Sequence, residues 1–409
     1  MSTTTSARPT SRSAFAALTL SLLATAARAD VLHVPGEFPS IAFAVEAAGP
    51  GDTILIAAGT YDEQVVVTGA EGLLLRGQGK VELTGTPPDV GLVLDACVDT
   101  TVEGLRFRGQ SLGLRVTGCT GVTVRRCRAE AIDEVGFDVL ASTGTVLDRC
   151  VVEGAVDQAL QVVNSLGGAV RRCTLRDVVA GLSVVATVAL EVERLTVDDT
   201  AGGAGLFLGP GTVGVQVQRS RFLRVASAGV FVIGDGNSFS RNLVLESSLA
   251  GFEFSAIAGS NVLDRDRVVR SGGTAFDLGG SAQQARGCRA VDAGDVGVLC
   301  ADAGGHLVQD ARVAKPGSYG ILVNGASDDC VLLDSRVAGA PENGIETAGD
   351  RAILSGNVSS GSGVNGFQVN SSFNTLTGNR ASGSGEFDLR DLVGASAYAD
   401  NDFGTVSFP

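Results

Sequence analysis

The sequence predicts an all-β protein built as a parallel β-helix, a solenoid of about 14 coils. The first observation is a repeated small–apolar–any–apolar motif, as in Gly113-Leu114-Arg115-Val116. The motif recurs in steps of 20 to 24 residues, and a fixed period in this range is typical of solenoids. It begins at Gly91, Gly113, Gly136, Ala159, Gly181, Gly205, Gly229, Gly251, Ala275, Gly297, Gly320, Gly344, Gly366 and Glu386.

The second observation is a further apolar run about thirteen residues after each motif. Examples are Val124-Arg125-Arg126-Cys127 and Thr377-Gly378-Asn379. Each period therefore holds at least two short β-branched runs separated by Gly, Ser, Asp and Asn, which indicates strand–turn–strand with no room for a helix. Leucine-rich repeats share the period, but their Leu-x-x-Leu-x-Leu frame is missing. The parallel β-helix remains.

The chain divides into four predicted parts. Residues 1–29 have a positive start, an apolar centre and the small-x-small site Ala27-Arg28-Ala29, which predicts a signal peptide and export to the periplasm or beyond. Residues 30–50 hold a strand and a short helix, Pro39 to Ala48, expected to cap the first coil. The β-helix follows over 51–394. Residues 395–409 break the period and read as a C-terminal cap, with a secretion-system docking tail as the alternative.

The composition limits the partners. The 409 residues carry a formal charge of −14, which disfavours nucleic acid and anionic membranes. No run after the signal peptide is apolar enough to span a membrane, and we expect a monomer. The chain has two histidines and no tryptophan, so a metal site built from several histidines is excluded and the commonest sugar-stacking side chain is absent.

The segment after the predicted helix carries a family resemblance. Gly51-Asp52-Thr53-Ile54 is followed by Gly59-Thr60-Tyr61-Asp62-Glu63 and an apolar strand. This opening resembles right-handed parallel β-helix proteins of the pectin-lyase-like superfamily, over residues 31 to about 390. The resemblance implies a right-handed β-helix and, in many members, secreted enzymes that act on polysaccharides.

The active-site motifs of individual enzyme families do not carry over. Gln158-Ala159-Leu160-Gln161-Val162 resembles a pectin methylesterase segment, but the coil after it lacks the required Asp. Asp328-Asp329 and Gly305-His306 resemble isolated parts of polygalacturonase motifs, and the Asp-Pro-His of alginate epimerases is absent. The resemblance therefore predicts the fold without naming a reaction.

The eight cysteines follow the coil period. Cys127, Cys150 and Cys173 share one position of the coil, and Cys97 and Cys119 share another. The first position continues with Ser, Asn and Asp, which indicates an inward ladder of small or hydrogen-bonding residues, with the thiols free and buried. Neighbours in such a stack lie within disulfide range, so bridges 97–119 and 127–150 stay open as alternatives.

An arginine precedes this ladder position in seven consecutive coils. One interpretation is structural, with Asp148, Glu193 and Asp264 neutralising the column. The other is a binding strip for a linear polyanion such as a uronate polysaccharide. The residues, called the turn arginines below, are Arg126, Arg149, Arg172, Arg194, Arg219, Arg241 and Arg265.

A second outward column includes Phe207, Phe231, Glu253 and Asp277 in consecutive coils, and is expected to end at Asp388. Two aromatic rings beside two carboxylates could hold a sugar ring and either a Ca²⁺ ion or an acid/base pair. The structural alternative is a loop at Gly209-Pro210-Gly211 that covers the rings, with the carboxylates solvated.

The function that these features favour is recognition of, or action on, a carbohydrate polymer outside the cytoplasm. Glu253 and Asp277 are the candidate catalytic residues, and the turn arginines with Phe207 and Phe231 are the candidate binding residues. Two alternatives remain. One is a polysaccharide lyase, hydrolase or esterase with its site on the outer face of the coils. The other is a non-catalytic structural or accessory rod.

Overall fold

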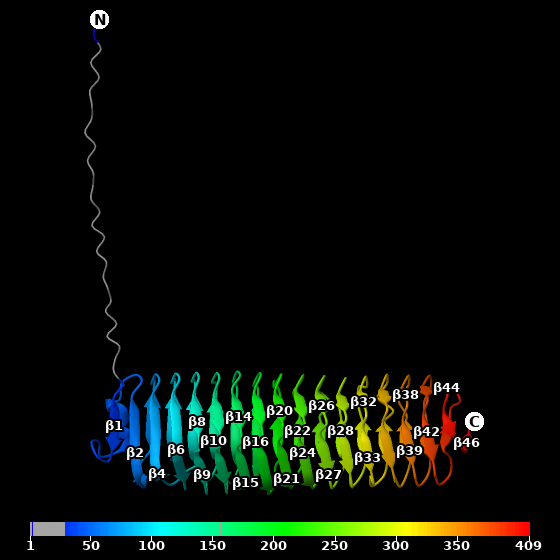
Figure 1. The fold of residues 1–409 in the computed structure, drawn as a ribbon, viewed down its shortest axis with the longest axis horizontal. Helices are drawn as coiled ribbons and strands as arrows, with labels where there is room; N and C mark the ends of the chain where they lie inside the picture. Colours follow the sequence, from blue (N-terminus) through cyan, green and yellow to red (C-terminus); the bar gives the residue numbers. More distant parts are fainter. Residues whose placement is uncertain (1, 3–28, 156) are drawn as a thin grey trace.

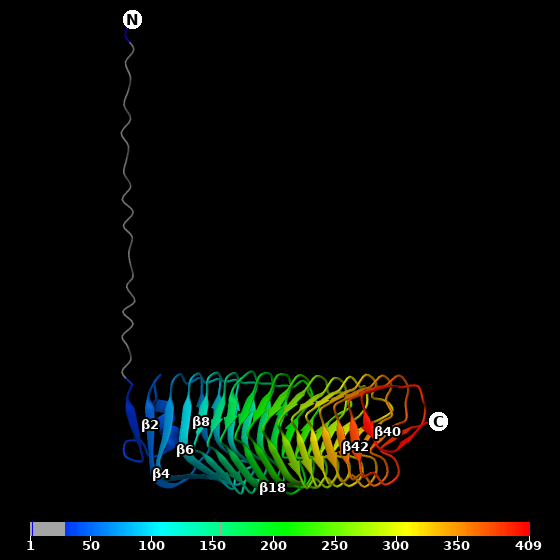
Figure 2. The same ribbon diagram turned by 45° about the vertical axis from the view of Figure 1, so that its right-hand side comes forward.

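The computed structural model describes Ser2, residues 29–155 and residues 157–409. The predicted signal peptide therefore lies, apart from Ser2 and Ala29, outside the described residues. The described chain winds into a β-solenoid of about 17 turns with one short helix, drawn as a rod in Figure 1. Figure 2 shows equivalent strands of successive coils side by side along the rod. The predicted fold class, a right-handed parallel β-helix with a helical cap, is confirmed.

Each regular coil contributes one strand to a 16-stranded sheet, the smaller sheet. Its strands pair in parallel and in register, so equivalent residues of neighbouring coils form columns about 4.8 Å apart. The strands are β3 (Val65–Thr68), β5 (Val90–Asp95), β7 (Leu112–Thr117), β10 (Val135–Leu140), β13 (Gln158–Val163), β16 (Ala180–Val185), β19 (Leu206–Leu208), β22 (Val230–Val232), β25 (Phe252–Phe254), β28 (Phe276–Leu278), β31 (Val298–Cys300), β34 (Ile321–Val323), β37 (Ile345–Thr347), β40 (Phe367–Val369), β43 (Leu389–Asp391) and β46 (Val406–Ser407).

The other strands belong to a 30-stranded sheet with two rows. The first row comprises β1 (Val31–Val34), β2 (Thr53–Asp62), β4 (Leu74–Thr84), β6 (Thr101–Arg108), β8 (Thr123–Arg125), β11 (Val146–Asp148), β14 (Ala169–Arg171), β17 (Glu191–Glu193), β20 (Gln216–Gln218), β23 (Ser238–Ser240), β26 (Val262–Asp264), β29 (Gln284–Arg286), β32 (Leu307–Gln309), β35 (Val331–Leu333), β38 (Ile353–Ser355), β41 (Thr375–Thr377) and β44 (Ala397–Ala399). The second row comprises β9 (Arg128–Glu130), β12 (Val151–Glu153), β15 (Thr174–Val178), β18 (Thr196–Thr200), β21 (Arg221–Val225), β24 (Leu243–Ser247), β27 (Arg267–Val269), β30 (Arg289–Val291), β33 (Arg312–Ala314), β36 (Arg336–Ala338), β39 (Val358–Ser360), β42 (Arg380–Ser382) and β45 (Asp402–Phe403).

The core runs through the centre of the coils. In β25 and β28 the inward Phe252 and Phe276 are buried and stack with ring centroids 5.6 Å apart, while the middle residue of each strand points outward. Because side chains alternate along a strand, each short strand buries two residues and presents one, or the reverse. Nearly every outward residue therefore belongs to a column that runs along the rod.

The turn between the two rows explains the predicted ladder. Its outer residue is left-handed in every coil from Arg126 onward, and the turn arginines have φ between 52° and 57°. Its inner residue points into the core. In the later coils the amide nitrogen of Asn357 donates to Oδ1 of Asn379 at 2.9 Å, and Asn379 does the same to Asn401. All eight cysteines are free and buried, which confirms the prediction for Cys127, Cys150 and Cys173 and leaves the alternative bridges 97–119 and 127–150 unformed.

The N-terminal cap is the helix α1 (Ile41–Ala47). Its N-cap is Ser40, whose hydroxyl accepts a hydrogen bond from the amide of Phe43, so the helix starts two residues after the predicted Pro39. The carboxylate of Glu63 accepts the amides of Ile41 and Ala42. Ile41 and Ala44 are buried and extend the core over the first coil.

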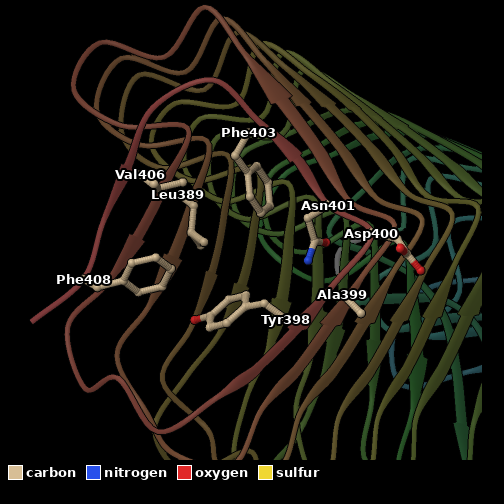
Figure 3. A pocket seen from close by; sticks show the side chains of 8 residues that line it. All are labelled: Leu389, Tyr398, Ala399, Asp400, Asn401, Phe403, Val406 and Phe408. Atoms are coloured by element: carbon tan, nitrogen blue, oxygen red, sulfur yellow. The ribbon is translucent and has the colours of Figure 1, made fainter.

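The C-terminal segment differs from the prediction. Residues 397–403 continue the period, because β44 and β45 pair with β41 and β42 at steps of 22 residues; the predicted break comes after them, where β46 joins β43 of the smaller sheet at a step of 17 residues. Phe403 packs against Phe367, and Phe408 against Tyr398. Between these rings an open pocket of about 290 Å³ remains at the end of the rod (Figure 3).

Two further expectations need correction. The count of about 14 coils was low, because it included only the coils that carry the small–apolar motif. The last copy was also misplaced by two residues: Gln368 pairs with Arg390, so Arg390 and not Asp388 is the outward residue of β43. No helix in the described part of the chain is long and apolar enough to cross a membrane.

Candidate functional site: the outer face of the smaller sheet

The outward column of the smaller sheet places two aromatic rings next to each other. Phe207 of β19 pairs in register with Phe231 of β22, and the rings stack with centroids 5.7 Å apart and planes 26° apart. Both side chains point outward and are half-buried, while the other two residues of each strand are buried in the core. Gly209 lies against the Phe207 ring, since a Cβ there would come within 2.9 Å of Cε1. The turn after β19 thus supports one ring and leaves both accessible.

The next two coils of this column carry carboxylates. Phe231 pairs with Glu253 of β25, and Glu253 pairs with Asp277 of β28. Burial, and after it the charges of Glu253 and Asp302, raise the pKa of Asp277 to about 6. A carboxyl group with this pKa exchanges its proton near neutral pH, as a general acid or base must. The rings and the carboxylates thus occupy four consecutive coils of one outward column.

Sequence reasoning missed Asp302 and the hydrogen-bond partners of Glu346. Asp302 follows β31, and its Oδ2 accepts the amide of Gly280 at 3.2 Å. Farther along the column, Glu346 accepts hydrogen bonds from Asn343 and Asn370, both at 2.7 Å. The sequence could have revealed these residues, because each lies in or within three positions of a strand of the smaller sheet. Aligning the turns as well as the strands would have found them.

The turn arginines lie on a different edge, between the two rows of the larger sheet, and all seven are exposed. The predicted acidic partners Asp148, Glu193 and Asp264 do form ion pairs, and Glu103 is an additional partner. The pairs are Arg126–Glu103 at 3.0 Å, Arg172–Asp148 at 2.6 Å, Arg194–Glu193 at 3.6 Å, Arg219–Glu193 at 3.4 Å and Arg265–Asp264 at 3.4 Å. Within the described residues, Arg149 and Arg241 have no ion pair.

The structure therefore does not bring the two sets of candidate residues together. The turn arginines are held mostly by acidic neighbours, whereas Phe207, Phe231, Glu253 and Asp277 form one continuous surface. In the described ranges, no group of three or more His, Cys, Asp or Glu side chains is placed to hold a metal ion. A cation on this surface would need oxygen ligands from a bound molecule as well.

Known proteins resemble this chain in sequence profile and in fold. The family described as "Right handed beta helix region" matches residues 72–212 and 204–381. No curated protein sequence matches the chain.

Solved structures give distant matches. The A-module of mannuronan C-5 epimerase from Azotobacter vinelandii matches with TM-score 0.40 and 13% identity, over 90% of this chain and 93% of that one. The catalytic domain of an α-1,3-glucanase in complex with nigerose matches with TM-score 0.42 and 10% identity, over 93% and 69%. The receptor-binding tailspike of bacteriophage Det7 matches with TM-score 0.39 and 12% identity, over 86% and 73%.

The family match describes the β-helix coils and names no reaction. The profile match covers most of the chain, and the coils it describes are the ones seen here. This chain belongs to the right-handed β-helix family.

Proposed function

We propose that this protein is exported and recognises a carbohydrate polymer through the outer face of the smaller sheet. The observation that carries the proposal is the stacked pair Phe207 and Phe231, which are half-buried like most residues of the outward column. Because the two rings stack on each other, their outward edges form one small apolar patch, against which the C–H groups of a sugar ring can pack.

The geometry of the column favours a polymer over a single sugar. Outward residues repeat about every 4.8 Å along the rod, because each belongs to the next strand. A chain lying along the rod would pass from the rings to Glu253 and Asp277 and then toward Glu346. Hydroxyl groups would find carboxylate acceptors at Glu253, Asp277 and Glu346, with the apolar Leu299 and Leu322 between the last two. A Ca²⁺ ion shared with the polymer remains part of the proposal.

A second candidate function, cleavage of the polymer, rests on one observation. Asp277 has a pKa raised to about 6 and stands one strand from Glu253. Two carboxyl groups at such close separation are the arrangement of a retaining glycosidase, in which one donates a proton and the other attacks the sugar. Asp277 would be the proton donor and Glu253 the nucleophile.

The turn arginines are proposed as an additional contact for acidic polymers. Arg149 and Arg241 support this role best, because neither forms an ion pair within the described residues. The five paired arginines would have to exchange an acidic neighbour for a ligand carboxylate, so their contribution to affinity should be small.

Screening the mature protein against a panel of neutral and acidic glycans tests the proposal. Phe207→Ala/Phe231→Ala should weaken binding of the selected glycan at least tenfold, since it removes the stacking surface. Phe373→Ala is the matched control, because this phenylalanine is 70% exposed and lies outside the column. Equal affinity of the double variant and the wild type would contradict the proposal.

Cleavage is tested on the same glycan by following new reducing ends, with and without a calcium chelator. Glu253→Gln and Asp277→Asn should each abolish cleavage and leave binding within a fewfold of wild type. Binding without product from the wild type would rule out the second candidate and keep the first.

A further inference from the structure

A second arginine column lies on the larger sheet, away from the turn. Arg267, Arg289, Arg312 and Arg336 begin the strands β27, β30, β33 and β36, and they pair in register with one another. All four are exposed. They stand about 4.8 Å apart, one strand spacing, so the column is about 14 Å long. We call these residues the strand arginines.

The strand arginines have almost no acidic partners. Within the described residues their only ion pair is Arg312 with Asp310, at 3.8 Å between two side chains that are about half exposed. Asp292 and Asp334 lie nearby in sequence and form no ion pair with any of the four. Four neighbouring positive charges, three of them without an ion pair in the described residues and one with a long, exposed one, are a site for a negative ligand.

The same column is neutralised elsewhere in the molecule. In the earlier coils Arg128 is paired with Glu130 and also with Glu153 of the next strand, at 2.5 Å. At the other end Arg380 is paired with Asp402 at 2.8 Å. Arg106 and Arg221 of the same column also form no ion pair within the described residues, but they stand singly, whereas Arg267 to Arg336 are four arginines in consecutive coils.

A groove runs beside the strand arginines. Where the earlier coils have Glu130 and Glu153 at the third position of each strand, these coils have Val291, Ala314, Ala338 and Ser360. The small residues leave a shallow hollow of about 240 Å³, lined by these side chains and by the stems of Arg289, Arg312 and Arg336. The exchange of carboxylates for alanines removes the partners of the arginines and makes room at the same place.

We propose that the strand arginines and this groove bind a linear acidic polysaccharide, lying along the rod with one carboxylate or sulfate per coil. Each guanidinium can hold a carboxylate through two parallel hydrogen bonds, and the aliphatic groove accepts the apolar face of the sugar. Nucleic acid is disfavoured, because no aromatic side chain lines the groove for base stacking and the whole chain carries a charge of −14. The site is separate from the Phe207 face and does not depend on it.

Titration with polygalacturonate at low salt tests this site. Wild type should bind, and at about 1 M NaCl, where the Debye length is roughly 3 Å, binding should be lost. Arg289→Gln/Arg312→Gln/Arg336→Gln should lower the affinity at least tenfold. The matched control is the same change in three turn arginines that are held by acidic neighbours, Arg172→Gln/Arg194→Gln/Arg219→Gln, which should change affinity less than threefold.

A second variant leaves every arginine in place. Ala314→Glu/Ala338→Glu puts carboxylates where the earlier coils have Glu130 and Glu153, on outward positions that tolerate them. It should abolish binding of polygalacturonate and keep binding of any neutral glycan selected by the Phe207 face.

Three results would overturn the proposal: no binding of polygalacturonate by wild type, unchanged affinity of both variants, or preference for a single-stranded oligonucleotide over polygalacturonate. Loss of neutral-glycan binding in Phe207→Ala/Phe231→Ala, with polygalacturonate binding intact, would confirm that the two sites are independent.

Discussion

The turn between the two rows of the larger sheet is built in two ways along the same rod. In three consecutive early coils it pairs an outer arginine with an inner cysteine, as at Arg149-Cys150. In the late coils it pairs an outer glycine with an inner asparagine, as at Gly356-Asn357. The thiol of Cys150 reaches the carbonyl of Val124 at 3.5 Å, whereas the amide of Asn357 reaches the carbonyl of Leu332 at 2.9 Å.

The late turn, with an outer glycine and an inner asparagine, is more stable than the early turn at both positions. A left-handed conformation costs a non-glycine residue roughly 1–2 kcal/mol, which Gly356 avoids and Arg149 does not. An amide also forms a stronger hydrogen bond than a thiol and offers an acceptor for the next coil. Seven successive coils nevertheless carry an arginine in this left-handed conformation, which lowers the stability of the fold. We infer that these arginines are kept for the outer surface and not for stability.

The largest expected effect comes from replacing the inner residue of the turn. Asn357→Ala should lower the free energy of unfolding by about 2–4 kcal/mol, because it leaves the amide of Ser335 and the carbonyl of Leu332 buried without partners. Cys150→Ala, the matched change, should cost roughly 1 kcal/mol, as only a weak donor and a small volume are lost. Chemical denaturation of both variants measures this, and equal losses would show that the two turns are equivalent.

The next effect concerns pH at Asp266, which takes an asparagine's place in the ladder. Burial raises the pKa of Asp266 to about 8, while its Oδ1 accepts both the backbone and the side-chain amide of Asn242. The folded state therefore keeps a proton that the unfolded state releases. This contribution to stability is complete below the ordinary pKa near 4 and is lost as pH rises toward 8.

Asp266→Asn should remove that loss. Thermal melts at pH 5 and pH 8 should show wild type falling with pH and the variant nearly level, with the variant the more stable at pH 8. A wild type that gains stability over this range, with the variant unchanged, would mean that Asp266 is ionised in the fold.

The smallest effect is on the outer residue. Arg149→Gly should raise stability by less than about 1 kcal/mol, because relief of the left-handed strain is partly offset by the entropy of glycine. Gly378→Arg should lower stability by a similar amount, since a Cβ there has room and only the backbone conformation is penalised. The denaturant midpoints of the two variants should shift in opposite directions. A lower midpoint for Arg149→Gly would point to an unrecognised contact of that arginine.

Much of the architecture could be predicted, because a fixed repeat length determines which residues of neighbouring coils lie side by side. Once Gly113 and Gly136 mark equivalent places, Phe207 must stand beside Phe231 and Glu253 beside Asp277. The prediction failed where the period weakened. The misplacement of Asp388 followed from a glycine position occupied by a larger residue in the last coil.

Charge compensation was harder to predict than position. The strand arginines are visible in the sequence as a column, yet only the ion pairs distinguish Arg128, which is neutralised, from Arg289, which is not. The raised pKa of Asp277 likewise depends on how deeply its strand is buried and on Asp302 in the following turn. These quantities depend on three-dimensional neighbours that no column of residues specifies alone.

The central claim, that a carbohydrate polymer lies along the outer face of the smaller sheet, is tested most directly by hydroxyl-radical footprinting with the selected glycan bound. Phe207 and Phe231 should be oxidised at least threefold more slowly in the complex, because the polymer covers their rings. Phe373, 70% exposed and off this face, should be oxidised at the same rate with and without glycan. Unchanged oxidation of Phe207 and Phe231 under saturating glycan would contradict the claim.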